Sequence, residues 1–325
     1  MSMPTATAEI GSLEQLYRLL PDLNYQPLWT LKGALTPEPV TQMVPYLWRY
    51  VEARELIERA GELISAHDAE RRVLAFRNPG TGRHELARTT DTLWAAVQLV
   101  LPGEVAPAHR HTPAALRYII EGEGAYTTVD GLRCPMERGD LVLTPNWAWH
   151  EHGHAGRGPM IWLDGLDIPM VHTMHLVFTE PGPGPSEPLD APERTLVYKL
   201  ADAERELSEL GDGDANPYDA LIHEYRDPAN GGPVLPTLSA YLQLLRPGVH
   251  TRPHRHTASA VYHVVRGSGS STIGGRRFDW TQGDTFAVPT WAQHEHANPG
   301  SSEALLFSFS DAPALQSLGL LREQG

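Results

Sequence analysis

The chain carries one histidine-bearing pattern twice, and this internal repeat constrains its fold more than any other feature. The first copy runs from Gln98-Leu-Val-Leu-Pro-Gly103 to His109-Arg-His111. A second copy, 145 residues later, runs from Gln243-Leu-Leu-Arg-Pro-Gly248 to His254-Arg-His256. Self-similarity at a fixed separation indicates that one structural unit occurs twice. The sequence therefore predicts two domains of the same architecture, in agreement with a length of 325 residues at about 150 residues per domain.

Each copy continues with a Gly-Asp pair and a Pro-x-Trp triplet and ends in His-Glu-His. In the first copy these are Gly139-Asp140, Pro145-Asn-Trp147 and His150-Glu-His152; in the second they are Gly283-Asp284, Pro289-Thr-Trp291 and His294-Glu-His296. Between these landmarks, short apolar runs alternate with Gly, Pro and Asn, which is typical of strands joined by turns. Each copy is therefore predicted to form a small antiparallel β-barrel or sandwich.

The sequence outside the two copies sets the predicted domain boundaries. Ser12 and the three residues after it resemble a capping box before a short helix, and a longer amphipathic helix is expected over about 45–66. Residues 1–70 are thus predicted to be a helical N-terminal extension, and residues 71–180 the first barrel. A Pro/Gly-rich segment, 181–194, is predicted to link it to a second barrel over residues 195–325.

Composition excludes several classes of partner. Lys and Arg total 26 against 40 Asp and Glu, so the net charge of -14 would repel nucleic-acid phosphates and anionic lipid surfaces. No apolar stretch is long enough to span a membrane, and the N-terminal residues do not resemble a signal peptide. The single cysteine, Cys134, has no partner for an intrachain disulfide. We therefore expect a cytoplasmic protein that binds neither nucleic acid nor membranes.

The histidines of the repeat point to metal chemistry. Strand side chains alternate between two faces, so His109 and His111 would lie on one face and could reach a single ion. A lone His-x-His pair is more often solvated or hydrogen-bonded, but here the pair recurs with fixed companions. The third histidine of the first copy, His150, completes a candidate set of three imidazole ligands. Imidazole suits Fe, Ni, Cu and Zn, so ligand type does not select the metal.

The spacing of these residues resembles the two-part motif of the cupin family, and its double occurrence resembles a bicupin. That resemblance implies a mainly β fold with two jelly-roll β-barrels, in which the third histidine lies opposite the His-x-His pair. Most metal cupins add a glutamate ligand shortly after the pair, whereas this chain has Ala115 and Leu116 there. Three neutral ligands would leave about three coordination positions open and the ion's charge uncompensated, which favours an anionic chelating substrate.

More specifically, three segments resemble gentisate 1,2-dioxygenase and its relatives that cleave salicylate or 1-hydroxy-2-naphthoate. These segments are Gln98–Gly103, His109–Gly122 and Trp162–Pro169. The resemblance implies one Fe(II) per chain in the N-terminal barrel and a homotetramer. It also implies ring cleavage of a small aromatic hydroxy acid by O2, with gentisate converted to maleylpyruvate. A second interpretation is a dioxygenase for salicylate, a substituted salicylate or 1-hydroxy-2-naphthoate; a third is a non-catalytic ligand-binding or storage bicupin.

Five residues are candidates for binding the substrate. Arg117 shares strand parity with His111 and would bind the substrate carboxylate, with an ion pair to an acidic neighbour at the barrel rim as the alternative. By resemblance, Gln98 would donate a hydrogen bond and Trp94 would form an aromatic wall, unless both merely pack within their strand. By the same resemblance, Ala96 is a small pocket residue, and relatives that accept salicylate tend to need more room there. An alanine instead of a glycine at this position therefore favours gentisate over salicylate. Arg72 matches a further arginine of the family.

Two residues are candidates for proton transfer. His152 lies two residues beyond His150 and so shares its strand face, where it could bond the second ring hydroxyl or act as acid and base. Asp164 matches a pocket aspartate of the family and would orient His152 or water, with an ion pair to an arginine as the alternative.

The second copy keeps the three ligand positions as His254, His256 and His294, which could bind a second metal. It replaces Arg117 by Tyr262, Trp94 by Ser239 and Asp164 by Ser308. The alternative is a structural barrel in which the histidines are only hydrogen-bonded. In either case we expect the chemistry in the first barrel.

Overall fold

The computed structural model describes residues 10–33, 35–185, 187 and 195–325, and these divide into two compact units, residues 1–40 and 41–325. In the first unit, helix α1 (Leu13–Asp22) begins where the sequence predicts, because the Ser12 hydroxyl accepts a hydrogen bond from the backbone N–H of Gln15. A short 3-10 turn, η1 (Leu28–Thr30), follows. Of the predicted linker, residues 186 and 188–194 lie outside the described part of the chain.

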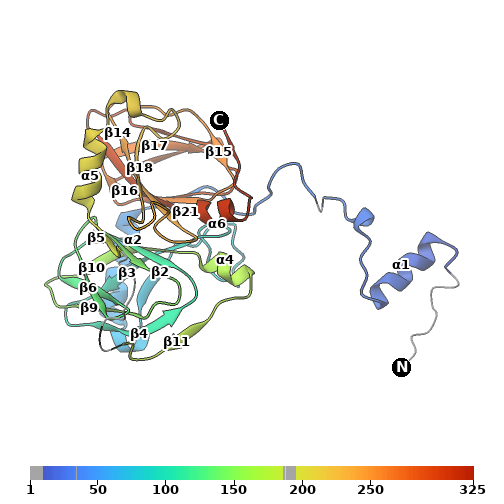
Figure 1. Cartoon of the computed structure of the whole chain (residues 1–325), viewed down its shortest axis with the longest axis horizontal. Coiled ribbons are helices and arrows are strands. Elements are labelled where there is room, and N and C mark those ends of the chain that lie inside the picture. Colours follow the sequence, from blue (N-terminus) through green and yellow to red (C-terminus); the bar gives the residue numbers. More distant parts are fainter. Residues whose placement is uncertain (1–9, 34, 186, 188–194) are drawn as a thin grey trace. The chain divides into compact units, whose positions relative to one another are not determined.

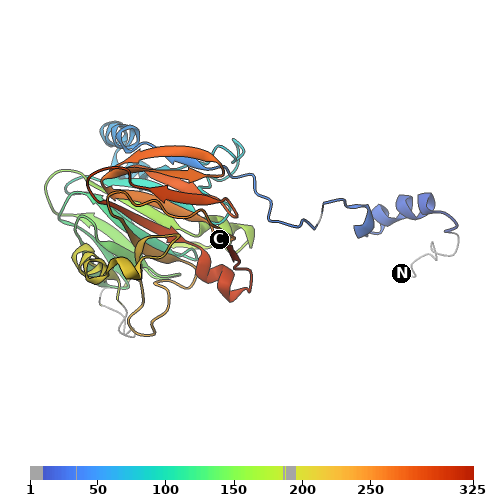
Figure 2. The same ribbon diagram turned by 90° about the horizontal axis from the view of Figure 1, so that it is seen from above.

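The second unit contains two antiparallel barrels (Figures 1 and 2). In the N-terminal barrel, one sheet has the order β12-β8-β5-β10-β3-β2 and the facing sheet the order β11-β4-β9-β6-β7. The first of these sheets consists of β2 (Arg72–Ala75), β3 (Trp94–Val100), β5 (Ala115–Glu121), β8 (Leu141–Thr144), β10 (Met160–Leu166) and β12 (Val197–Tyr198). The facing sheet consists of β4 (Val105–His111), β6 (Ala125–Val129), β7 (Leu132–Met136), β9 (His150–His154) and β11 (Thr179–Pro181).

The C-terminal barrel repeats this plan with a six-stranded sheet of order β1-β19-β16-β21-β14-β13. That sheet consists of β1 (Tyr46–Trp48), β13 (Leu221–Tyr225), β14 (Ser239–Leu245), β16 (Ala260–Arg266), β19 (Thr285–Val288) and β21 (Ala304–Ser310). The facing layer is formed by β17 (Ser268–Ile273), β18 (Arg276–Thr281) and β20 (His294–Ala297), with β15 (Arg255–His256) paired to β22 (Glu323–Gln324). The predicted mainly β fold with two barrels is confirmed.

Helices lie outside the barrels. They are α2 (Tyr50–Leu63), α3 (Ala66–Ala69), α4 (Ile168–Thr173), α5 (Leu200–Glu209), the 3-10 turn η2 (Asp212–Asp214) and α6 (Ala312–Ser317). Among the described residues, no helix is both long and apolar enough to cross a membrane.

The two six-stranded sheets pack against each other, and this explains why their strands are apolar on both faces. Alternate residues of β5 and β10, such as Leu116 and Leu163, join Phe307 and Phe309 of β21 in one buried cluster. Tyr118 stacks on Phe307 with ring centroids 4.2 Å apart. The residues of opposite parity face the interior of their own barrel, so pocket residues and inter-barrel core alternate along each strand.

The barrels also exchange edge strands, which the sequence did not predict. Residues 46–48, expected to begin a long helix, instead form β1 and pair with β19 of the C-terminal barrel; only Tyr50–Leu63 is helical. Reciprocally, β12 pairs with β8 of the N-terminal barrel. Because β1 lies within the predicted extension of residues 1–70, that extension contributes to the second barrel as well as preceding the first.

The Gly-Asp pair of each copy anchors the exchanged segment. Asp284 accepts hydrogen bonds from the Arg49 side chain and the Tyr50 backbone N–H, at 2.7 and 3.0 Å. Asp140 accepts one from Lys199 at 2.7 Å. A repeat motif whose role was unassigned in the sequence thus holds the two barrels together.

Gly165 offers a test of the inter-barrel packing. A Cβ atom there would lie 2.7 Å from Cζ of Phe309 and 2.8 Å from Cδ1 of Leu116. Both distances are shorter than those at which a Cβ atom contacts its neighbours in proteins. We expect Gly165→Ala to lower the free energy of unfolding by about 1–3 kcal/mol through overpacking, seen as a lower melting temperature. Gly213→Ala, where a Cβ meets no atom within 4 Å, is the control. Equal melting temperatures for the two variants would contradict this packing.

Candidate metal centre and substrate pocket

Three histidines meet inside the N-terminal barrel as the repeat predicts. His109 and His111 lie on β4, His150 lies on the adjacent strand β9, and His109 pairs with His150 in register. The ring centroids are 4.1 Å apart for His109–His150 and 4.7 Å apart for His111–His150. One nitrogen from each ring lies within 4.8 Å of the others, so the three side chains could hold a metal ion.

Backbone carbonyls orient two of these rings. Nδ1 of His111 lies 2.8 Å from the Pro113 oxygen, and Nδ1 of His150 lies 3.0 Å from the Ala148 oxygen. These contacts assign the ring proton to Nδ1 and leave Nε2 as the ligand atom, an arrangement typical of metal-binding histidines. Nε2 of His150 is buried without a hydrogen-bond partner, which a metal ion would supply.

The Pro-x-Trp triplet supports this geometry in a way that its sequence did not reveal. Trp147 has a left-handed backbone conformation, with φ of 62°, and its backbone N–H donates a hydrogen bond to the carbonyl oxygen of His111 at 2.8 Å. Trp291 does the same to His256 in the second barrel, also with φ of 62°. The tryptophan of each motif therefore fixes the backbone of a metal-ligand candidate.

The electrostatic surroundings keep the first triad neutral. Burial, reinforced by the positive charge of Arg71, lowers the pKa of His109 to about 3. Burial lowers the pKa of His111 to about 4, and burial with the charge of Arg117 lowers the pKa of His150 well below its usual range. Neutral imidazole is the form that binds metal, so these side chains are ready ligands at neutral pH.

Arg117 lies in the interior of the barrel, as predicted from its strand parity. It is 4 % exposed, and its Nη1 donates to the Thr144 hydroxyl at 2.5 Å. Its Nε lies 3.3 Å from Oδ1 of Asp164, its register partner on β10. The ion pair with an arginine that was the alternative for Asp164 is therefore present, but it is buried in the barrel and does not lie at the rim expected for a pair that involves Arg117. Burial nevertheless raises the pKa of Asp164 to about 6, despite the opposing charge of Arg117.

Strand register brings further predicted residues to the same sheet face. Ala96 pairs with Asp164 and Gln98 pairs with Trp162, so the alternate residues of β3, including Trp94, share the face that carries Arg117. Nε2 of Gln98 is buried without a hydrogen-bond partner and is thus an available donor.

His152 is buried next to the triad. Its ring centroid is 5.8 Å from that of His150, and its Nδ1 lies 2.9 Å from the Thr127 hydroxyl. Burial and the charge of Arg117 lower its pKa well below the usual range, so the ring is neutral. A neutral imidazole can both accept and donate a proton.

The prediction for Arg72 is wrong by one residue. Arg72 pairs with Glu104 and donates to the Gly61 carbonyl, away from the triad. Arg71 lies beside the triad instead, with Nη2 only 2.5 Å from Nδ1 of His109. The register explains the difference: Arg72 pairs with Leu99, whose side chain belongs to the face opposite to Gln98, so the neighbouring residue Arg71 has the parity of the pocket face.

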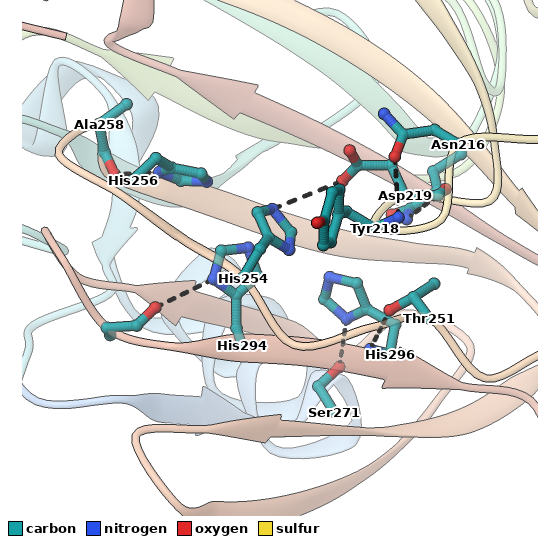
Figure 3. A network of polar contacts seen from close by, with 12 residues as sticks. Asn216, Tyr218, Asp219, Thr251, His254, His256, Ala258, Ser271, His294 and His296 are labelled. Atoms are coloured by element: carbon teal, nitrogen blue, oxygen red, sulfur yellow. Dashed lines mark hydrogen bonds and ion pairs between the residues drawn. The ribbon is translucent and has the colours of Figure 1, made fainter. Parts of the chain in front are cut away.

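The second triad has a similar geometry in the C-terminal barrel (Figure 3). The ring centroids are 4.2 Å apart for His254–His294 and 4.9 Å apart for His256–His294. Tyr262 and Ser308 are register partners here, in the positions of Arg117 and Asp164. Two of the three substitutions read from the repeat, Tyr262 for Arg117 and Ser308 for Asp164, therefore occupy equivalent positions in space.

Comparisons with known proteins agree with this site. The family model described as a cupin domain matches residues 96–166 and 241–310. The chain is 38% identical to gentisate 1,2-dioxygenase 1 of Aquipseudomonas alcaligenes over 99% of each chain. It is 35% identical to a 1-hydroxy-2-naphthoate 1,2-dioxygenase of a Nocardioides species over 86% of this chain and 79% of the relative.

A solved structure extends this likeness to three dimensions. The salicylate 1,2-dioxygenase of Pseudoaminobacter salicylatoxidans, crystallised as an adduct with gentisate, matches with a TM-score of 0.86 and 32% identity. The match covers 100% of this chain and 96% of that one. By its two cupin matches and these full-length relatives, the chain belongs to the gentisate 1,2-dioxygenase family of bicupins.

Proposed function

We propose that the N-terminal barrel cleaves the ring of gentisate with O2 in an Fe(II)-dependent reaction that yields maleylpyruvate. The observation that carries this proposal is the charge of the pocket. Three neutral imidazoles stand beside two arginines, Arg71 and Arg117, and the carboxylate of Asp164 balances only one of them. A dipositive ion added to this pocket calls for an anionic ligand, which a hydroxybenzoate carboxylate supplies.

The donor set fits iron, because imidazole nitrogen is a common ligand for Fe(II) and the Nε2 atom of His150 lacks any other partner. His109, His111 and His150 would hold the ion. Bound there, Fe(II) would supply the redox chemistry that activates O2 toward the aromatic ring. The relatives' activities toward gentisate, 5-aminosalicylate and 1-hydroxy-2-naphthoate support a substrate of this class.

The chain's own residues would bind and orient that substrate. Arg117 would donate to its carboxylate while remaining paired with Asp164, and the free amide N–H of Gln98 would donate to a substrate oxygen. His152, neutral and buried, would bond the second ring hydroxyl and exchange a proton with it. Arg71, whose Nη2 lies 2.5 Å from Nδ1 of His109, would offer a second positive charge to the substrate anion.

Oxygen uptake tests the proposed reaction. Protein loaded anaerobically with Fe(II) should consume O2 in proportion to gentisate, with the ultraviolet absorbance of a ring-fission product appearing at the same rate. Salicylate and 1-hydroxy-2-naphthoate are run in parallel. Uptake with only one of these would keep the mechanism and change the substrate. No uptake from any of them, despite bound iron, would favour the non-catalytic bicupin.

Ala96 is the proposed determinant of substrate range. It is fully buried and is the register partner of Asp164, so its methyl group limits the pocket beside the Arg117 pair. Ala96→Gly is expected to raise kcat/KM for 1-hydroxy-2-naphthoate relative to gentisate by about 10-fold or more, since one methyl group discriminates by about 1–3 kcal/mol. The measurement is kcat/KM for both substrates. An unchanged ratio would place the size limit elsewhere.

A further inference from the structure

A cavity of about 480 Å³ lies where the two barrels meet, and none of the triad histidines lines it. We infer that this inter-barrel cavity binds a small aromatic carboxylate. The ring of the ligand lies between apolar walls, and its carboxylate accepts hydrogen bonds from Arg138 and from the hydroxyl of Tyr118. The site is separate from the proposed reaction and does not depend on it.

The lining of the inter-barrel cavity comes from equivalent positions of the two copies. At the repeat separation of 145 residues, Tyr118 on β5 corresponds to His263 on β16, and their ring centroids lie 5.8 Å apart. The residue before each Gly-Asp pair also lines the cavity, as Arg138 in the first copy and as Gln282 in the second. Because equivalent positions hold different side chains, the two halves of the cavity differ in chemistry. The Tyr118 hydroxyl and the Arg138 charge are both contributed by the first copy.

Apolar and aromatic side chains form walls that suit a ring. Ile120 and Val265 come from β5 and β16, and Tyr50 and Leu200 stand at the start of helices α2 and α5. Burial lowers the pKa of His263 to about 3, so this ring is neutral and adds a further aromatic surface. Ligand pockets commonly measure about 300–1,000 Å³, so the inter-barrel cavity can hold one small aromatic molecule.

The hydroxyl of Tyr118 is the group that most directly indicates a ligand. Tyr118 lines the cavity and is only 1 % exposed, and its hydroxyl has no hydrogen-bond partner among the described residues. Burial raises the pKa of this hydroxyl well above its usual value, so it keeps its proton and can donate. Buried polar groups normally have a partner, and the carboxylate oxygen of a ligand would provide one.

Two of the charged side chains that line the cavity are already paired. Glu121 accepts hydrogen bonds from the Tyr50 hydroxyl at 2.8 Å and from Nε of Arg54 at 3.1 Å. Arg266 forms an ion pair with Glu204. The charges within these pairs cancel, so neither Glu121 nor Arg266 decides the sign of the charge on a ligand.

Arg138 provides the charge that remains. Its side chain is exposed, and within the described part of the chain it forms no ion pair with a carboxylate. Its positive charge opposes the rise that burial causes in the pKa of Tyr118, so the guanidinium lies near that hydroxyl. An arginine and a hydroxyl donor placed together suit a carboxylate, and one unpaired cation balances a monoanion.

Benzoate tests the inference, because it has a ring and one carboxylate but lacks the ortho hydroxyl with which a hydroxybenzoate chelates a metal ion. Isothermal titration calorimetry of the full chain, loaded with Fe(II) and kept without O2, is expected to show benzoate binding. Tyr118→Phe should weaken this binding about tenfold or more, since it removes a hydrogen bond to a charged group. Its melting temperature without ligand should not fall, because the hydroxyl that it removes has no partner. Arg138→Gln, a change at an exposed position, should weaken binding by a similar factor.

Tyr225→Phe is the matched control. Tyr225 is also 1 % exposed and its hydroxyl also lacks a partner, but it does not line the cavity. Its replacement should leave benzoate binding unchanged. A second control, Arg117→Met/Asp164→Asn, removes the buried charges of the N-terminal pocket and should likewise leave benzoate binding in the inter-barrel cavity intact.

Several outcomes would overturn the inference. One is the absence of benzoate binding at millimolar concentration, and another is equal weakening by Tyr118→Phe and Tyr225→Phe. Loss of binding only in Arg117→Met/Asp164→Asn would place benzoate in the N-terminal barrel. Equally tight binding of inorganic phosphate, weakened by Arg138→Gln but not by Tyr118→Phe, would show attraction to a surface cation alone. Because none of these measurements follows ring cleavage, a failure of the proposed reaction would leave the inference standing.

Discussion

Replacing His109 by alanine is expected to remove the metal from the N-terminal barrel and to abolish ring cleavage. His109 faces His150 across β4 and β9 at 4.1 Å between ring centroids, so its loss leaves two imidazoles and no carboxylate at that centre. Loss of an outer-shell partner already costs a metal site about 10–100-fold in affinity or activity, so the loss of a ligand should exceed about 100-fold. Iron content and oxygen uptake with gentisate measure the two effects.

The control for this variant is His172→Ala. His172 is an exposed histidine on α4 and does not belong to either triad, so its replacement should leave iron content and turnover unchanged. Full turnover by His109→Ala would move the chemistry to the triad of the C-terminal barrel. That outcome would also contradict the assignment of the arginine-lined pocket as the substrate site.

Strand parity explains how much of this site could be predicted from the sequence. Two-residue alternation places His109 with His111, His150 with His152, and Arg117 in the interior, and the structure contains each of these arrangements. Parity requires a known register, however. The single-residue error at Arg72 arose because nothing in the isolated segment shows that it pairs with Leu99 rather than with Gln98.

Contacts between the copies were beyond such an argument. Residues 46–48 have an amphipathic pattern compatible with a helix, and only the free edge of β19 makes them a strand. Local helix and strand propensities carry no information about a pairing strand that lies more than a hundred residues away in the sequence.

Replacing Arg117 by alanine is expected to raise KM for gentisate by about 10–100-fold, because a hydrogen bond to a charged group contributes about 1.5–3 kcal/mol. The same change also leaves Asp164 buried without its partner, and breaking a buried ion pair costs about 3–5 kcal/mol of stability. A single variant therefore confuses substrate binding with folding.

The double variant Arg117→Met/Asp164→Asn separates these roles, since it removes both charges and leaves no unpaired ion in the barrel. If Arg117 served only to neutralise Asp164, the double variant would recover the wild-type KM. If Arg117 grips the substrate carboxylate, KM stays high although the melting temperature recovers. We expect the second result, because Arg117 lies close enough to the triad for its charge to be felt by His150 and His152. In this position, Arg117 could pair with the carboxylate of a substrate that chelates the metal. The substrate carboxylate and Asp164 would then both balance the charge of Arg117, which explains why an arginine can be buried inside the barrel.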